Sequence, residues 1–217
     1  RVDLKTYPQK IGYIQGTGDV VPECLQQIGY DVQIIEEEQI NKEALKKFSA
    51  IVVGIRAYNV REKLKFQQDI LMDYVEAGGT LIVQYNTNHA LYLDSPGPYP
   101  LSLSRDRVTV EEAPVEILEP MHELMTKPNK ITAKDFDNWV QERGLYFPNE
   151  WDEKYTPILS SFDPGESQKK GGLLYAKYGK GHFVYTGYSW FRQLPAGVPG
   201  AYRIFANMLS VGKSPQP

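Results

Sequence analysis

The sequence predicts an α/β fold in which a mainly parallel, doubly wound sheet carries helices on both faces. In the first half of the chain, short apolar runs alternate with amphipathic segments that end at glycines. Two of the runs, residues 50–55 and 80–85, are almost continuously apolar, as is typical of parallel strands buried on both faces. Four strands separated by three helices require crossover connections, which favour a parallel sheet.

The strands of the first half are expected at residues 10–14, 31–35, 50–55 and 80–85. Asp19 can cap the first helix, which should end at Gly29, and Asn41 can cap a short second helix. The third helix is the clearest, because Leu64, Leu71 and Val75 lie on one face ahead of a Gly-Gly pair.

The second half is less regular and contains a β-hairpin. Its expected elements are a long loop at 92–104, strands at 115–118 and 155–160, a helix at 133–142, a polar loop at 163–172, hairpin strands at 173–178 and 181–187, and a final helix after 199–200. The whole chain, 1–217, is predicted to be one flavodoxin-like domain with a core at about 10–210. Residues 1–9 and 212–217 are expected to be extended or frayed.

Composition excludes several classes of protein. The 24 Lys and Arg residues against 27 Asp and Glu residues give a net charge of −3, which argues against a nucleic-acid or anionic-membrane surface. No apolar run reaches the roughly 20 residues of a membrane span. A single cysteine, Cys24, excludes an internal disulfide. The chain begins at Arg1 rather than Met, so we expect it to be a piece of a longer protein.

Four motifs that suggest enzyme chemistry have simpler explanations. Residues 16–19 (GTGD) lack the third glycine of a dinucleotide-binding loop and suit a tight turn with a capping aspartate. Cys24 lies inside the first expected helix, which favours a structural thiol. Ser189 lacks the second glycine of a nucleophile elbow. The three histidines are far apart and show no metal-ligand spacing, so neither a metal nor any other cofactor is expected.

Polar and aromatic residues follow the predicted strands, where ligands bind in doubly wound sheets. This rule and the later Tyr- and Trp-rich segments give the candidate cleft: Gln15, Arg56, Tyr58, Asn59, Tyr85, Asn86, Asn88, His89, Arg143, Trp151, Asp152, Trp190 and Arg192. Aromatic rings beside Arg, Asn and Asp suit a sugar, because rings stack on it and its hydroxyl groups need partners. Internal packing of the same tyrosines is the competing interpretation.

Two segments resemble the class I glutamine amidotransferase-like superfamily and its ThuA-like branches: 77–83 (AGGTLIV) and 178–187 (YGKGHFVYTG). Four others resemble more closely the C-terminal domain of large bacterial PIG-L (LmbE-like) deacetylases: 54–59 (GIRAYN), 84–87 (QYNT), 142–147 (ERGLYF) and 191–203 (FRQLPAGVPGAYR). The resemblance covers about residues 10–209. It implies the amidotransferase-like fold and a neighbouring deacetylase domain as partner. Because relatives on such deacetylases are often exported, it also implies a periplasmic or secreted setting.

The catalytic residues of these families do not carry over. Active amidotransferases place a cysteine in a G-x-C-x-G elbow after the strand that corresponds to 80–84, where this chain has Tyr85-Asn86-Thr87. Their late H-x-E pair is also missing, because neither His122 nor His182 is followed by it. The A-H-P-D-D-type zinc motif of the deacetylases does not occur in the sequence.

Two functions follow from these observations. The first is a non-catalytic accessory module of a carbohydrate-active deacetylase, which binds a glycan or docks on the catalytic domain. The second is an enzyme in its own right that acts on a small polar or sugar substrate in the cleft. It would need an acid or base, for which His89, Glu142 and Asp152 are the candidates.

Overall fold

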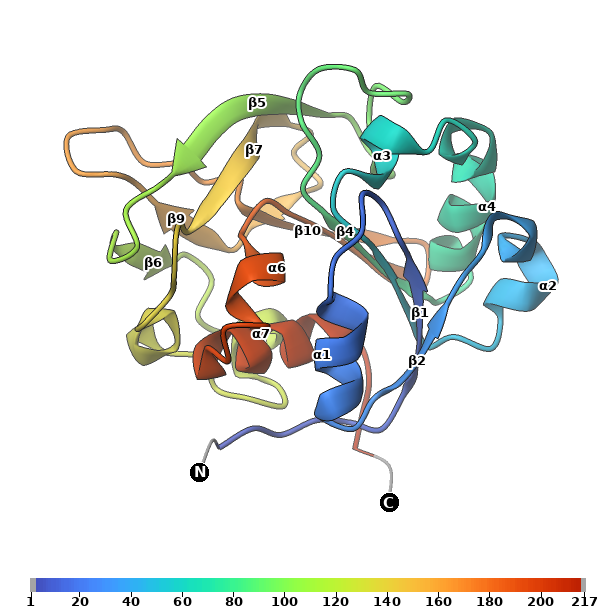
Figure 1. The fold of residues 1–217 in the computed structure, drawn as a ribbon, viewed down its shortest axis with the longest axis horizontal. Helices are drawn as coiled ribbons and strands as arrows, with labels where there is room; N and C mark the ends of the chain where they lie inside the picture. Colours follow the sequence, from blue (N-terminus) through green and yellow to red (C-terminus); the bar gives the residue numbers. More distant parts are fainter. Residues whose placement is uncertain (1–2, 216–217) are drawn as a thin grey trace.

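The computed structural model describes residues 3–215 and is built around a seven-stranded sheet (Figure 1). The order in the sheet is β2 (Asp31–Ile34), β1 (Lys10–Ile14), β3 (Ala50–Val53), β4 (Thr80–Gln84), β11 (Gly181–Thr186), β10 (Leu173–Tyr178) and β8 (Thr156–Pro157). The first five strands are parallel, and the last two run antiparallel to their neighbours. The predicted doubly wound, mainly parallel sheet and the predicted hairpin are therefore confirmed.

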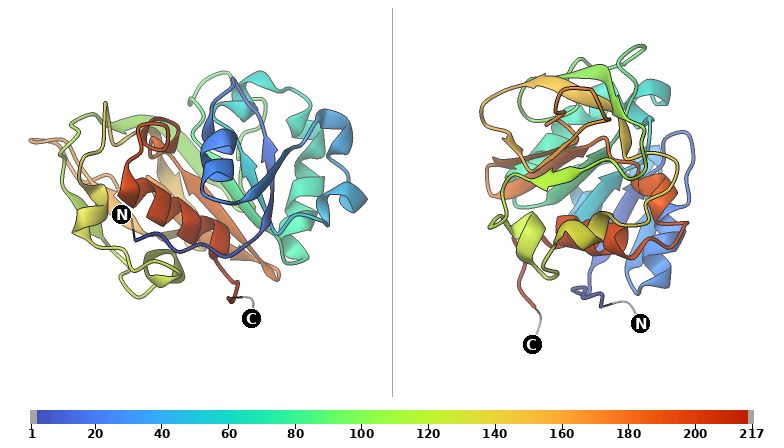
Figure 2. Two further views of the ribbon diagram at one scale, coloured as in Figure 1. Left: turned by 60° about the horizontal axis from the view of Figure 1, so that its bottom comes forward. Right: turned by 90° about the vertical axis from the view of Figure 1, so that its left-hand side faces the viewer.

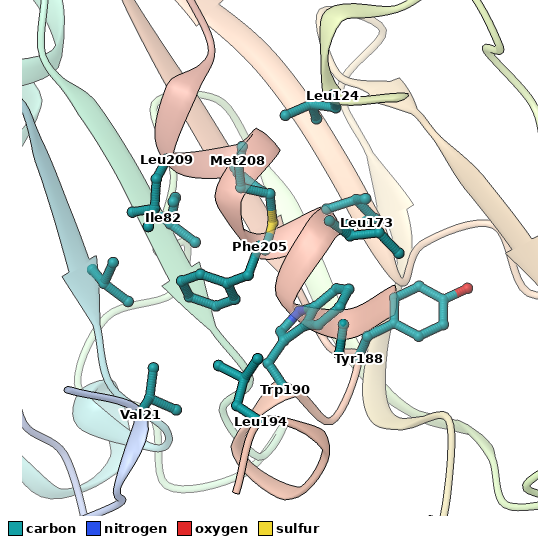
Figure 3. Packing of buried hydrophobic residues seen from close by; sticks show 14 of the residues in the cluster. Val21, Ile82, Leu124, Leu173, Tyr188, Trp190, Leu194, Phe205, Met208 and Leu209 are labelled. Carbon is teal, nitrogen blue, oxygen red and sulfur yellow. The ribbon is translucent and has the colours of Figure 1, made fainter. Parts of the chain in front are cut away.

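Helices cover both faces of this sheet (Figure 2). One face carries α1 (Val21–Gln27), α6 (Trp190–Gln193) and α7 (Pro199–Ser210), and the other carries α2 (Lys42–Leu45) and α4 (Leu64–Glu76). Alternate residues of each strand supply the two cores: Ile82 packs under Phe205 and Met208 of α7 (Figure 3), whereas Leu81 packs with the α4 side.

Two short ribbons lie beside the main sheet. One pairs β5 (Leu101–Val108) with β7 (Gly144–Trp151), and the other pairs β6 (Val115–Ile117) with β9 (Leu159–Ser161). The remaining elements are η1 (Glu37–Gln39), α3 (Ala57–Val60), α5 (Glu123–Thr126) and η2 (Ala133–Phe136). The β5–β7 ribbon lies at the carboxyl end of the parallel strands, and the first and last described residues lie at the amino end (Figure 1). Leu145 N donates to Gly187 O over 3.0 Å and ties this ribbon to the end of β11.

Local chemistry explains the predicted turns and caps. Asn41 Oδ1 accepts a hydrogen bond from Ala44 N over 2.9 Å and caps α2, as predicted. Asp19 Oδ1 accepts a hydrogen bond from Val21 N, but the N-cap of α1 is Val20, so Asp19 stabilises the turn before the helix rather than capping the helix. Gly16 is required because a Cβ there would collide with the Ile55 carbonyl oxygen. The GTGD segment is thus a tight turn packed against the β3–α3 connection.

The structure corrects two elements of the second half. The expected loop at 92–104 ends inside β5, and the expected helix at 133–142 is only the short η2, because the chain after Phe136 turns to pack Trp139 against the core.

Backbone groups near both ends of the described chain bond to its body. Lys5 N donates to Asn129 Oδ1 over 2.8 Å, and Gly212 N donates to Glu123 Oε2 over 2.8 Å. Residues 1–2 and 216–217 of the expected frayed ends lie outside the described residues. Between residues 3 and 215, no helix is long and apolar enough to cross a membrane.

Two half-buried histidines form a stack at the amino edge of the sheet. The His122 ring lies edge-on to Tyr175 with 4.5 Å between centroids, and the Tyr175 hydroxyl lies 2.6 Å from His182 Nδ1. His122 Nδ1 also accepts a hydrogen bond from Leu124 N at the start of α5. Burial lowers the pKa of both histidines below the ordinary value of 6.5, and the nearby Lys213 charge lowers that of His182 further.

We expect stability to fall as pH falls below about 6.5, because the unfolded chain then binds protons that the folded histidines do not. Urea unfolding at pH 7.5 and pH 5.5 measures this difference. In a His122→Asn, His182→Gln chain, which keeps a capping side chain at the start of α5, the loss should be smaller than in the wild type. An equal loss in both chains would assign the pH dependence to other groups.

Candidate functional site

The carboxyl ends of β1, β3 and β4 bring together three of the predicted residues. Gln15 and Tyr85 follow β1 and β4 directly, and Arg56 lies three residues after the end of β3. Arg56 N donates to Tyr85 O over 2.8 Å, so the two connections are held side by side. Gln15 O accepts a hydrogen bond from the Arg61 guanidinium, which fixes the end of β1 to the chain after α3.

Aromatic rings cover this edge. The rings of Tyr85 and Tyr146 stack with 6.3 Å between centroids and an angle of 9° between planes. Phe191 of α6 lies against Tyr85 at 5.3 Å, and His89 meets Tyr146 edge-on at 6.3 Å. We call Tyr85, Tyr146 and Phe191 the aromatic platform. Tyr146 and Phe191 are half-buried, so part of the platform faces solvent.

The backbone around the platform is strained. Positive φ angles occur at Arg56 (59°), Ala90 (54°), Gln141 (68°) and Tyr146 (49°), and at only one further non-glycine residue between 3 and 215. A left-handed conformation costs an ordinary residue about 1–2 kcal/mol, and such strain clusters at functional sites. Irregular pairing between β5 and β7 accompanies the turn at Tyr146. Such irregularities re-aim side chains, so the ribbon is shaped to place this ring on Tyr85.

A hollow of about 550 Å³ adjoins the platform. Its lining residues are Arg105, Arg107, Glu142, Leu145 and Tyr146. Because Tyr146 belongs to both features, platform and hollow form one continuous surface. A volume of this size is within the range of small-molecule sites.

One ion pair is fixed at the border of the site. Arg192 Nε lies 2.6 Å from Glu142 Oε1, and Arg192 Nη1 donates to Gln141 Oε1 over 2.7 Å. The guanidinium also lies over the Phe191 ring at 4.8 Å from its centroid. Burial raises the pKa of the Tyr85 hydroxyl, while the charges of Arg56 and Arg192 oppose that rise.

Three polar atoms at the ends of neighbouring strands are buried without a protein partner: Gln15 Oε1, Arg56 Nε and Gln84 Oε1. A buried polar group without a partner costs roughly 1–3 kcal/mol. Two acceptors and one donor at the same edge of the sheet match the hydrogen-bonding needs of a polyhydroxylated ligand.

Several predicted residues lie in the interior instead and are removed from the candidate site. Tyr58 is fully buried and its hydroxyl donates to Gln68 Oε1 over 2.7 Å. Asn86 is also fully buried, and its side chain bonds Tyr58 N and Gln84 O. Trp190 is fully buried beneath the platform.

Arg143 and Asn59 are structural. Arg143 is 4% exposed, and its guanidinium donates to the carbonyl oxygens of Ala113 and Phe136. Burial lowers its pKa. Asn59 Nδ2 lies within hydrogen-bond distance of three carbonyl oxygens in residues 87–90 and thereby holds the loop that presents Asn88 and His89 to solvent.

Trp151 and Asp152 lie far from the platform. In the β5–β7 ribbon Leu101 pairs with Trp151, whereas Val108 pairs with Gly144 near the platform. Five residues of strand separate Tyr146 of the platform from Trp151, which is roughly 16 Å at the usual rise. Both residues line a different hollow of about 370 Å³.

Reasoning from the strand ends missed most of the ribbon's contribution. Glu142 was a candidate acid or base, but Arg105, Arg107 and Tyr146 of the ribbon, and Phe191 of α6, were not in the candidate cleft. The available signal was the i, i+2 spacing of the two arginines, which places both on one face of a strand; the register shift of β5 after Leu103 breaks the alternation of the whole segment 101–107 (LSLSRDR). Within residues 3–215, no group of three or more His, Cys, Asp and Glu side chains is arranged to hold a metal ion.

Comparisons with known proteins identify the fold. No family model matches the sequence, and no curated protein is similar to it. A GMP synthase subunit from Thermoplasma acidophilum matches 94% of this chain over 93% of its own, with a TM-score of 0.59 and 11% identity. A ThuA-like protein from Bacteroides uniformis matches 100% over 97%, with a TM-score of 0.58 and 13% identity. The chain therefore has the class I glutamine amidotransferase-like fold.

The same fold also occurs inside a longer chain. The β-galactosidase from Rahnella sp. R3 matches 100% of this chain over 33% of its own, with a TM-score of 0.54 and 15% identity.

Proposed function

We propose that this chain is a non-catalytic module that binds a glycan for a carbohydrate-active, PIG-L-type deacetylase. The observation that carries the proposal is the aromatic platform, whose Tyr146 is held in a strained conformation beside a hollow of about 550 Å³. Sugars bind to such surfaces because their C–H faces pack on rings while their hydroxyl groups bond to nearby polar groups. Gln15 and Arg56, which are half-buried at the strand ends, supply polar side chains for that purpose.

The site favours binding over turnover. Tyr85-Asn86-Thr87, which contains no cysteine, stands where the amidotransferases that the sequence resembles carry the elbow of their nucleophilic cysteine. Cys24 lies in α1, where burial raises the pKa of its thiol. The Glu142 carboxylate is bonded to Arg192, and the His89 ring has Asn88 Oδ1, at 3.4 Å, as its one hydrogen-bond partner among the described residues. A nucleophile next to a base is therefore not assembled in the described residues.

A neighbouring catalytic domain is part of the proposal. It rests on the resemblance of residues 54–59, 84–87, 142–147 and 191–203 to the C-terminal domain of PIG-L deacetylases. The β-galactosidase with the same fold in about a third of its chain supports this arrangement, because there too the fold accompanies a sugar-acting enzyme. The deacetylase domain would supply the hydrolytic chemistry and this chain would hold the substrate.

The test is a thermal-shift panel of amino sugars, N-acetylated sugars and oligosaccharides, followed by calorimetric titration of those that bind. A ligand at 100 times its Kd should stabilise the fold by about 2.7 kcal/mol. Phe191→Ala should weaken binding by roughly 2- to 10-fold, the equivalent of one aromatic contact. Phe66→Ala, an exposed ring on α4, is the matched control and should bind like the wild type.

A flat panel, or an equal loss in the Phe66→Ala chain, would contradict the glycan site. Turnover of a sugar by the isolated chain that is lost in His89→Ala would instead support the alternative, an enzyme in its own right.

A further inference from the structure

The hollow beside Tyr146 carries an excess of positive charge. Arg105 and Arg107 are two residues apart on β5, so their side chains project from the same face, about 7 Å apart along the strand. Both are exposed, and both line the hollow. Asp106, between them, belongs to the opposite face of the strand and does not line the hollow.

The acidic residues around the hollow do not neutralise these two arginines. Arg105 forms no ion pair within residues 3–215. Arg107 meets Glu166 at 3.7 Å, but both side chains are exposed, and such pairs are weak. The Glu142 carboxylate is held by Arg192 at 2.6 Å. Two guanidinium groups therefore remain available, in a chain whose net charge is −3.

We infer that the hollow binds an acidic sugar, with its carboxylate on Arg105 and Arg107 and its ring against Tyr146. This inference rests on the proposed glycan-binding function and names the class of glycan. Arginine suits a carboxylate because its planar fork donates two parallel hydrogen bonds. The ring and the two forks border the same hollow, so one sugar residue can contact all three.

The four arginines at this site have different partners and therefore different roles. Arg192 is committed to Glu142 and Gln141 and lies over Phe191, so it supports the platform. Arg56 presents a buried Nε at the strand ends. Arg56 does not line the hollow, whereas both arginines of β5 do and neither is held by a strong internal ion pair, so this pair sets the specificity.

Two tetrasaccharides test the inference by calorimetric titration at low salt. Hyaluronan tetrasaccharide contains glucuronate and N-acetylglucosamine, and chitin tetrasaccharide contains N-acetylglucosamine alone. We expect the hyaluronan fragment to bind at least about 10-fold more tightly, because hydrogen bonds between charged groups are the stronger kind. Arg105→Gln and Arg107→Gln should each bring the ratio of the two affinities toward one. Lys180→Gln removes a charge at the hairpin turn, near the opposite edge of the sheet, and should leave the ratio unchanged.

The outcomes distinguish failure of the acidic-sugar inference from failure of the proposed glycan-binding function. Equal affinities for the two fragments would overturn the acidic-sugar inference and leave the glycan site standing. A ratio that falls as much in Lys180→Gln as in Arg105→Gln would show attraction to charge in general and would also overturn it. Binding of neither fragment by a chain with an unaltered unfolding curve would overturn both the inference and the proposed function.

Discussion

A Trp190→Ala chain is expected to lose about 3–5 kcal/mol of its free energy of unfolding. The indole is fully buried and lies 5.3 Å from the Trp139 ring and 6.1 Å from the Phe205 ring, measured between centroids. Its Nε1 donates to Thr186 Oγ1 over 2.9 Å at the end of β11. Truncation would leave a large cavity among the core side chains between α6, α7 and the sheet (Figure 3).

Urea unfolding measures this loss, and the adjacent residue of α6 provides the control. Phe191 is only half-buried, so Phe191→Ala should change stability much less while it weakens binding. If Trp190→Ala unfolded at the same urea concentration as the wild type but lost ligand binding, Trp190 would belong to the site after all. Comparison of Trp190→Ala with Phe191→Ala thus distinguishes a residue of the core from a residue of the platform.

The first half of the fold was predictable because its signals are local. Residues 50–55 and 80–85 are apolar on both faces, which only a central parallel strand requires, and Asn41 identifies a helix start by its own side chain. Such patterns specify secondary structure without knowledge of what packs against it. The topology then follows from the handedness of the crossovers.

The second half depends on long-range contacts that periodicity does not record. Residues 133–142 carry apolar side chains at helical spacing, yet the chain leaves the helical conformation after Phe136. Trp139 Nε1 then donates to Asp135 O, and Val140 N donates to Gln193 Oε1 across 53 residues. Strand β7 was not predicted either, because its interior proline and its positive φ at Tyr146 break the usual pattern of a strand.

The candidate site shows the same division between residues that local patterns predict and residues whose positions depend on long-range contacts. The rule that ligands bind beyond the strand ends found Gln15, Arg56 and Tyr85, which do converge. The rule also selected Tyr58, and the Tyr- and Trp-rich segments added Trp190, because residue type alone does not tell which side of the backbone faces the core. The site residues on β5 and β7 could not be placed from the sequence, because their positions depend on how the two strands pair.

Tyr146 offers the sharpest test of the candidate site, because stability and binding should respond to it in different ways. At φ 49°, a glycine is relaxed and an alanine is strained. Tyr146→Gly should therefore be more stable than Tyr146→Ala by about 1 kcal/mol, although it is the smaller side chain. Both chains should lose at least about 10-fold in sugar affinity, because each removes the ring shared by the platform and the hollow.

Parallel urea unfolding and calorimetric titration of the two variants would provide both measurements. Phe66 supplies a control pair: Phe66→Gly in the regular helix α4 should be less stable than Phe66→Ala by about 1 kcal/mol, the opposite order, with no effect on binding. If Tyr146→Gly were instead the less stable of its pair, the backbone would carry no strain there. If both Tyr146 variants bound sugar like the wild type, the ring would not be part of the site. A strained backbone maintained for a ring that binds ligand is the combination that distinguishes a functional platform from surface packing.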